Sequence, residues 1–175
     1  MAFDIADFKA NFTNGGARPN LFEVRVSSPV GDIASNIAFS FTCKAAQIPA
    51  STIAQIDVPY FGRQIRFAGN RTFEPWTVTI LNDEGFTVRR SLENWMEAIN
   101  GNASNVQSVN QTQYKDTDAQ VVHYGKDGSI IAVYNFVGMF PTEIAAIDLD
   151  WETNDQLEEF QVTFGYDYWE RNLPI

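Results

Sequence analysis

The sequence has little of the side-chain chemistry on which enzymes and metal proteins depend. It contains one cysteine, Cys43, and one histidine, His123. A lone cysteine cannot form a disulfide within the chain, which fits a reducing compartment. No partner near His123 in the sequence could complete a nucleophilic triad or a zinc site, so we interpret it as a structural or surface histidine. With no P-loop and no GxGxxG motif either, we predict no catalytic residue, no cofactor and no metal site.

Long apolar runs and an N-terminal signal are also lacking. The chain begins M-A-F-D-I-A-D, without basic residues ahead of an apolar stretch, and no segment approaches the length of a membrane span. The net charge of -10 disfavours binding to nucleic acid or to anionic membranes. We expect no signal peptide and no membrane partner. Whether the acidity has a function beyond solubility stays open from composition alone.

The acidic residues gather towards the C-terminal end. From Glu143 onward the only basic residue is Arg171, and the acids are Glu143, Asp148, Asp150, Glu152, Asp155, Glu158, Glu159, Asp167 and Glu170. Six oxygen-bearing residues match the ligand spacing of an EF-hand loop: Asp148, Asp150, Glu152, Asn154, Gln156 and Glu159. However, Thr153 stands where that loop needs glycine, and the flanking patterns are those of strands. We interpret these acids as one face of a hairpin.

Alternating patterns predict that hairpin. From Glu159 onward, the apolar side chains Phe160, Val162, Phe164, Tyr166 and Tyr168 alternate with polar ones, as in a half-buried strand. Residues 147–151 alternate too, and residues 153–156 supply turn chemistry. We expect an antiparallel pair with an aromatic and an acidic face.

Similar patterns predict most of the remaining chain. Strands are expected at residues 21–27, 37–44, 75–81, 119–124 and 129–137, and one amphipathic helix at residues 86–99. A protruding hairpin is expected at residues 52–68, and Asn70 and Arg71 are placed in the turn after it. The prediction is a single domain, residues 1–175, that is mainly β: an antiparallel sandwich or partly open barrel with one packed α-helix.

Two segments are candidates for contacts with other molecules. The hairpin at residues 52–68 carries Tyr60 and Phe61 beside Arg63 at its tip, and exposed apolar tips mark interaction sites. The alternative, that both aromatic rings fold under the domain's own core, stays open. The N-terminal arm, residues 1–16, carries Phe8 and Phe12 ahead of a glycine pair, and it either folds back or docks on a neighbour.

An ordered series of phrases indicates a family. The phrases are A-R-P-N-L-F (17–22), C-K-A (43–45), A-G-N-R-T-F (68–73), W-T-V-T-I-L-N-D-E (76–84), G-M-F-P-T (138–142), L-D-W (149–151) and F-Q-V-T-F-G-Y-D-Y-W-E (160–170). Together they resemble the tail tube proteins of contractile-tailed bacteriophages, over nearly the whole chain. The resemblance implies the barrel fold that is shared with the tube proteins of type VI secretion systems and pyocins.

The resemblance also implies a function. Such a protein is a structural part of the virion tail, assembled in the cytoplasm of the host bacterium. Its copies form six-fold rings that stack into the inner tube, with the tail sheath, baseplate and tail terminator proteins as partners. A tape-measure protein occupies the lumen, and double-stranded DNA passes through during ejection without specific binding. Two alternatives are a tube subunit of a phage-derived contractile injection device and a monomeric β-sandwich binding module that uses Tyr60, Phe61 or Trp169.

Our residue assignments for the tube are inferences beyond that resemblance. For contacts between subunits we predict Phe8, Phe12, Tyr60, Phe61, Gly62, Arg63, Asn70 and Arg71. For the face towards the lumen we predict Ser40, Thr42, Gln55, Asp57, Glu159 and Gln161. An acidic lumen would keep the DNA backbone from adhering, because cationic contacts are what hold DNA. The competing hypothesis is that the acids from Asp148 to Glu159 face the sheath or the junction between rings.

Overall fold

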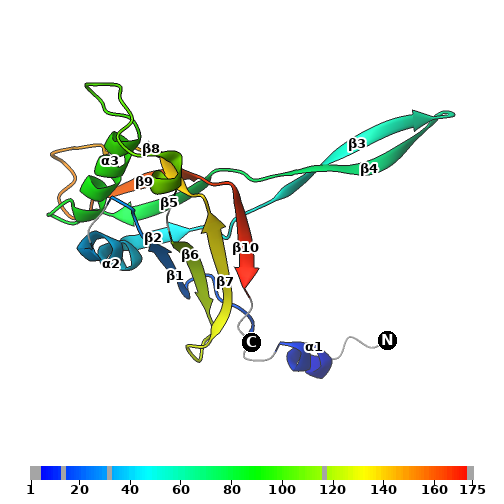
Figure 1. Ribbon diagram of the computed structural model, residues 1–175. Helices are drawn as coiled ribbons and strands as arrows, with labels where there is room; N and C mark the ends of the chain where they lie inside the picture. Colours follow the sequence, from blue (N-terminus) through cyan, green and yellow to red (C-terminus); the bar gives the residue numbers. More distant parts are fainter. Residues whose placement is uncertain (1–4, 13–14, 31–32, 116–117, 173–175) are drawn as a thin grey trace.

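The computed structural model of the chain describes residues 5–12, 15–30, 33–115 and 118–172. A rounded body carries a long two-stranded ribbon that projects far from it, and the N-terminal helix α1 (Ile5–Asn11) lies apart from the body (Figure 1). The ribbon consists of β3 (Thr52–Tyr60) and β4 (Arg63–Thr72). The predicted protruding hairpin is therefore confirmed, although β4 continues beyond the expected end at residue 68.

Two antiparallel four-stranded sheets form the body. Sheet I has the order β1-β6-β7-β10, and sheet II has the order β2-β5-β9-β8. The bounds in sheet I are β1 (Phe22–Val26), β6 (Ala119–Tyr124), β7 (Ile130–Val137) and β10 (Tyr168–Asn172). Those in sheet II are β2 (Cys43–Ala46), β5 (Trp76–Leu81), β9 (Glu159–Gly165) and β8 (Phe140–Ile144). This mainly β arrangement confirms the predicted fold class.

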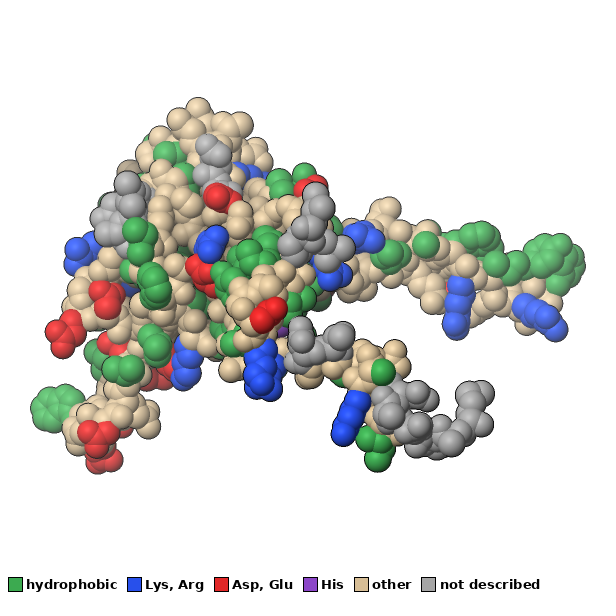
Figure 2. Space-filling view, turned by 90° about the horizontal axis from the view of Figure 1, so that it is seen from below, with side chains coloured by type: hydrophobic (Ala, Val, Ile, Leu, Met, Phe, Trp, Pro, Cys, Tyr) green, Lys and Arg blue, Asp and Glu red, His purple; other side chains and the backbone are tan. Residues whose placement is uncertain are grey.

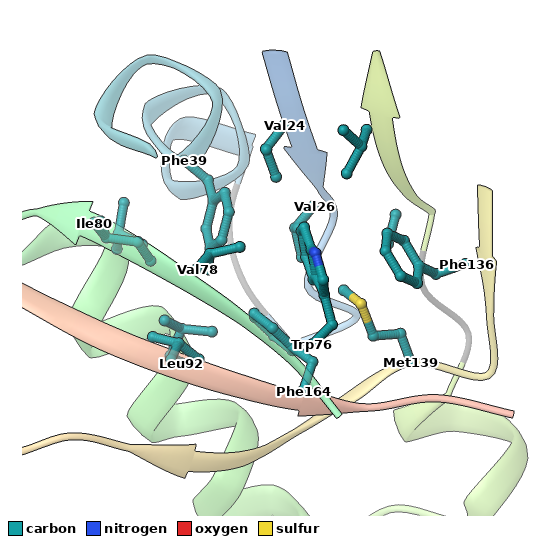
Figure 3. Close-up of a cluster of buried hydrophobic side chains, with 14 of the residues drawn as sticks. Val24, Val26, Phe39, Trp76, Val78, Ile80, Leu92, Phe136, Met139 and Phe164 are labelled. Atoms are coloured by element: carbon teal, nitrogen blue, oxygen red, sulfur yellow. The ribbon is translucent and has the colours of Figure 1, made fainter. Parts of the chain in front are cut away.

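The core lies where the two sheets face each other, as Figure 3 shows. Strand alternation decides which side chains enter it, since Trp76, Val78 and Ile80 are buried while the threonines between them are not. The ring centroids of Trp76 and Phe136 lie 4.5 Å apart and connect the sheets. The other buried side chains from strands include Val24, Val26, Val121, Phe160, Val162 and Phe164.

The helix α3 (Thr87–Ile99) covers one side of this core with Val88, Leu92 and Trp95. Its start is held by Asp83, whose carboxylate accepts hydrogen bonds from the Thr87 backbone N–H (2.9 Å) and hydroxyl (2.7 Å). These bonds stabilise the charged carboxylate, so the pKa of Asp83 lies below its ordinary value. The predicted mid-chain helix is confirmed, with its first residue at Thr87.

The predicted strand at residues 37–44 is wrong. Residues Ile33–Thr42 form the helix α2, and only the four residues that follow form β2. Ser35, Phe39 and Cys43 follow one another at intervals of four residues, so the buried Ser35 and Phe39 share a helix face. Phe41, which strand alternation placed inward, is 85% exposed. The prediction of one packed helix is incomplete, because α2 and the short α4 (Gln111–Tyr114) are helices as well.

The predicted strand at residues 147–151 is wrong as well. β9 pairs with β5 on one side and with β8, which ends at Ile144, on the other; residues 145–158 form a loop without regular structure. The final strand also divides, because β9 ends at Gly165 and β10 begins at Tyr168 in the other sheet. Tyr168 is consequently exposed, whereas Phe160, Val162 and Phe164 are buried as expected.

Candidate functional site

In the described part of the chain, β3 and β4 pair with each other and with no other strand. Every residue of β3 is exposed, which is unusual for a nine-residue strand. The strands are joined by Phe61 and Gly62, whose φ angles of 44° and 82° fit the type I′ turn that suits the twist of a two-residue hairpin. A two-stranded ribbon in water is at best marginally stable by itself. A projecting ribbon of this length therefore suits a surface that another protein covers.

The two faces of the ribbon differ in polarity. Residues opposite each other in register share a face, and the pairs Ile56–Phe67 and Val58–Ile65 make one face apolar. The pairs Asp57–Arg66 and Pro59–Gln64 lie on the other face, with Gln55 hydrogen-bonded to Asp57 at 2.6 Å. The apolar side chains remain substantially exposed; they are Ile56, Val58, Tyr60, Ile65 and Phe67. This face has the composition of an interface, and none of the described residues covers it.

The tip of the ribbon presents two aromatic rings to solvent. Phe61 is 92% exposed, and its ring packs edge-on against that of Tyr60 at a centroid distance of 4.6 Å. The alternative that these rings fold under the core is therefore wrong. A positive φ costs a residue with a side chain about 1–2 kcal/mol, and asparagine or glycine is preferred in such a turn. Phenylalanine at this position is better explained by contact with another molecule than by the turn itself.

The base of the ribbon is fixed to the body by aromatic residues. The Trp169 indole N–H donates to the Ala50 carbonyl at 3.2 Å, just before β3 begins. Phe73, just after β4, packs edge-on against Trp169 and tilted against Tyr166. The ribbon therefore extends from an anchored base. Trp169 lies at this base, whereas Tyr60 and Phe61 lie at the tip of the ribbon.

The outer surface of sheet II is polar. Glu159 and Gln161 lie on it, as the strand pattern predicts, because Phe160 and Val162 face the core. Glu159 forms an ion pair with Lys44, and the Thr77 and Thr163 hydroxyls are 3.1 Å apart. This surface is a wall of hydroxyl, amide and charged groups suited to contact with water.

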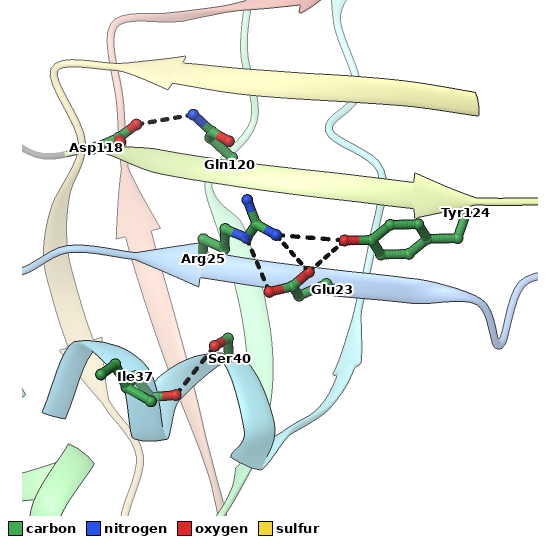
Figure 4. A network of polar contacts seen from close by, with 7 residues as sticks. All are labelled: Glu23, Arg25, Ile37, Ser40, Asp118, Gln120 and Tyr124. Atoms are coloured by element: carbon green, nitrogen blue, oxygen red, sulfur yellow. Dashed lines mark hydrogen bonds and ion pairs between the residues drawn. The ribbon is translucent and has the colours of Figure 1, made fainter. Parts of the chain in front are cut away.

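The strand on which Ser40 and Thr42 were placed does not exist, so their assignment to a polar strand face is wrong. Both lie in α2. The Ser40 hydroxyl donates to the Ile37 carbonyl at 3.1 Å, as Figure 4 shows, and the Thr42 hydroxyl donates to the Ala38 carbonyl at 2.9 Å. The two hydroxyls therefore satisfy helix carbonyls, a common role for serine and threonine in helices.

The remaining predicted contact residues lie in different parts of the molecule. Asn70 and Arg71 are exposed near the base of the ribbon, within β4, so their placement in a turn is wrong. Phe12 follows α1 and is about half exposed. The side chain of Phe8 lies outside the described residues, as do residues 1–4, 13 and 14 of the predicted arm.

Sequence patterns missed the acidic loop, by which we mean residues 145–158. Backbone hydrogen bonds hold its two ends, from Ala145 N–H to Gln161 and from Asn82 N–H to Glu158, both 2.8 Å long. Between them Leu149, Trp151 and Leu157 are 85%, 98% and 76% exposed. Alternating apolar residues on an acidic background could have suggested an exposed apolar loop, but the same letters fit a strand.

Across the described residues, no group of three or more acidic, cysteine or histidine side chains could hold a metal ion.

Two further polar features are structural. Figure 4 shows Arg25 donating to both carboxylate oxygens of Glu23 at 2.9 Å, with the Tyr124 hydroxyl also donating to Glu23. Mainly because of the Arg25 hydrogen bonds, the pKa of Glu23 lies below its ordinary value. Burial raises the pKa of the Cys43 thiol to about 12, so the thiol is protonated at neutral pH.

In the part of the chain that the structure describes, no helix is long and apolar enough to cross a membrane.

Comparisons with known proteins agree with this geometry. Two solved structures share the fold: the tube-terminating cap of the anti-feeding prophage (TM-score 0.66, 16% identity, 91% of this chain and 92% of that chain) and the sheath–tube complex of an extracellular contractile injection system (TM-score 0.64, 14% identity, 99% and 100%). In sequence, the chain is 35% identical to the tail tube protein gp19 of Enterobacteria phage T4 over 97% of this chain and 95% of that protein. It is 26% identical to a tail tube protein of Serratia phage KSP90 over 93% of each. The family model described as "Phage tail tube protein" matches residues 7–172. The chain therefore belongs to the phage tail tube protein family, a family of structural proteins.

Proposed function

We propose that copies of this chain assemble into six-fold rings, which stack into the hollow inner tube of a contractile phage tail. The observation that carries this proposal is the ribbon of β3 and β4, whose apolar face and aromatic tip are left exposed by the residues that the structure describes. An exposed apolar surface of this kind marks a protein–protein contact. Because the relatives named above with the higher sequence identity are phage tail tube proteins, the proposal takes a phage tail rather than another contractile device.

The ribbon supports assembly in two ways. Burying its apolar side chains against a neighbouring copy removes them from water, which is the main favourable term in protein association. The outer edges of β3 and β4 also carry unpaired backbone groups, and such edges readily add to the strands of another chain. In the proposed ring the tip residues Tyr60, Phe61, Gly62 and Arg63 contact the next subunit, as do Asn70 and Arg71 at the ribbon base and Phe8 and Phe12 from the arm.

The polar surfaces support a channel. We assign Glu159 and Gln161 on sheet II, and Gln55 and Asp57 on the polar face of the ribbon, to the wall that faces the lumen. The net charge of -10 disfavours adhesion of the phosphate backbone, so double-stranded DNA passes without specific binding. At physiological salt this repulsion extends about 8 Å, so it acts only at the wall. The tape-measure protein occupies the lumen before ejection, and sheath, baseplate and terminator proteins contact the outside and the ends.

Negative-stain electron microscopy and sedimentation of the purified chain across concentrations test this proposal. Rings or hollow tubes are expected in the wild-type protein. The variant Phe61→Asp is expected to stay folded by circular dichroism but to form no polymer, since a charge replaces the exposed ring at the tip. The conservative variant Phe61→Leu should still assemble. A wild-type chain that stays monomeric even when mixed with tail baseplates would refute the proposal.

A further inference from the structure

The acidic loop and the ribbon lie at opposite ends of the molecule (Figure 1). Figure 2 shows the same separation on the surface, with hydrophobic and acidic side chains at one end and hydrophobic and basic side chains on the projecting ribbon. Each end exposes large apolar groups: Trp151 with Leu149 and Leu157 on the loop, and the aromatic tip with the apolar face on the ribbon. The two surfaces cannot meet within one chain.

Their charges are complementary. The acidic loop has no lysine or arginine, and its five acids are Asp148, Asp150, Glu152, Asp155 and Glu158, a net charge of -5. Residues 52–72 of the ribbon contain three arginines and one acid, a net charge of +2; these residues are Arg63, Arg66, Arg71 and Asp57. Opposite potentials across an interface guide association and fix which surfaces meet. In a chain of net charge -10, the ribbon is the locally basic surface that an acidic loop can approach.

We infer that the acidic loop of one subunit docks on the ribbon of a neighbouring copy. This inference rests on the proposed self-assembly and adds which surface meets which. The contact is heterologous, because two different patches of the same chain meet. Repeating such a contact generates a closed ring or an open helical filament. It would also cover both exposed surfaces on every copy that has neighbours on both sides.

The side chains near the ribbon tip suit the loop in detail. Arg63 lies opposite Tyr60 in register, so this arginine shares the apolar face of the ribbon with Val58 and Ile65. An indole ring can pack on those aliphatic groups and also receive the guanidinium on its face, a contact that favours tryptophan and arginine. Trp151 supplies the indole, and Glu152 beside it supplies a carboxylate for Arg63. Tryptophan and arginine are also the residues most enriched where interfaces derive their affinity.

A charge-swap experiment tests the pairing. Arg63→Glu alone and Glu152→Arg alone are each expected to raise the concentration needed for assembly at least tenfold. The double variant, with both charges exchanged, is expected to return to within about threefold of wild type, because the pair is restored with opposite polarity. Matched controls are Lys126→Glu and Glu84→Arg, two exposed charges in other parts of the body. Neither control should change assembly, and neither should rescue the other charge variants.

A cross-linking experiment tests the same contact between the acidic loop and the ribbon without altering the charges. The double variant Ile65→Cys and Thr153→Cys places one thiol on the apolar face of the ribbon near its tip and one on the loop of every chain. Oxidation after assembly should join the chains into a ladder of disulfide-linked oligomers. Wild-type tubes with neither rescue nor cross-linking would overturn this inference and leave the proposed function standing. A wild-type chain that never assembles would instead refute the proposed function and this inference with it.

Discussion

Replacing Phe61 by asparagine separates the fold of the ribbon from its contacts. Phe61 has a φ of 44°, in a turn where asparagine before glycine is strongly preferred. The substitution therefore keeps or improves the local backbone while it removes the aromatic ring. Within the chain that ring packs against Tyr60 and is otherwise almost fully exposed. We expect Phe61→Asn to fold normally and to lose assembly.

The substitution should change the free energy of association much more than the free energy of unfolding. Relief of the positive φ offsets the loss of the exposed Tyr60 contact, since each is worth about 1 kcal/mol, so the free energy of unfolding should change by less than about 1 kcal/mol. Removing an aromatic anchor from a protein interface costs about 2–4 kcal/mol. At 1.4 kcal/mol for each factor of ten, this weakens association about 30- to 1000-fold. The assembly threshold should therefore rise by at least tens of times while monomer stability is unchanged.

Urea denaturation measures the first quantity, and sedimentation velocity with electron microscopy measures the second. A matched control is Phe86→Asn, which replaces another phenylalanine at positive φ (51°) on the body of the protein. Phe86 is 41% exposed and precedes α3, so its replacement should leave assembly unchanged. An unchanged assembly threshold in Phe61→Asn, or a monomer destabilised by more than about 2 kcal/mol, would contradict a role for the Phe61 ring in contacts between subunits alone.

Two further predictions concern the body of the protein. Trp95→Ala removes a fully buried ring whose N–H donates to the Tyr114 carbonyl at 3.1 Å, so urea denaturation should show a loss of about 3–5 kcal/mol. Asp83→Ala removes the carboxylate that holds the start of α3 and should cost about 1 kcal/mol at pH 7. Because the pKa of Asp83 is lowered in the folded protein, its contribution is present above the ordinary pKa and disappears as the pH falls through the folded value. Denaturation at pH 7 and at pH 2–3 should show the difference between wild type and Asp83→Ala shrinking in acid; an undiminished difference would contradict this assignment.

Several elements could be predicted because their local patterns have one interpretation. The alternation in β5 and β9 fixes which side chains enter the core, and the apolar stripe of α3 fixes its buried face. The two strands of the ribbon were found because a glycine-containing turn separates two alternating segments. In each case the local periodicity and the tertiary burial agree.

Prediction from the sequence failed where the same apolar residues fit both the helical period of 3.6 residues and the strand period of two. In residues 37–44, Phe39 and Cys43 are spaced for one face of a helix, and with Phe41 they are also spaced for one face of a strand. Packing against β1 and α3 decides for the helix, and the Ser35 and Ser91 hydroxyls meet at 3.2 Å in the buried contact. The acidic loop has the same ambiguity, and pairing of β9 with β8 decides it by excluding residues 147–151 from the sheet.

The amino-acid sequence was sufficient to predict the family, the mainly β class, the inner faces of the principal strands and a protruding hairpin with an aromatic tip. These depend on residue order and on periodicity, which are local properties of the chain. The three-dimensional structure was needed to show that the apolar face of the hairpin is exposed and that residues 145–158 form a loop at the far end of the molecule. Those facts depend on which strands pair and where each sheet ends, and long-range contacts set both.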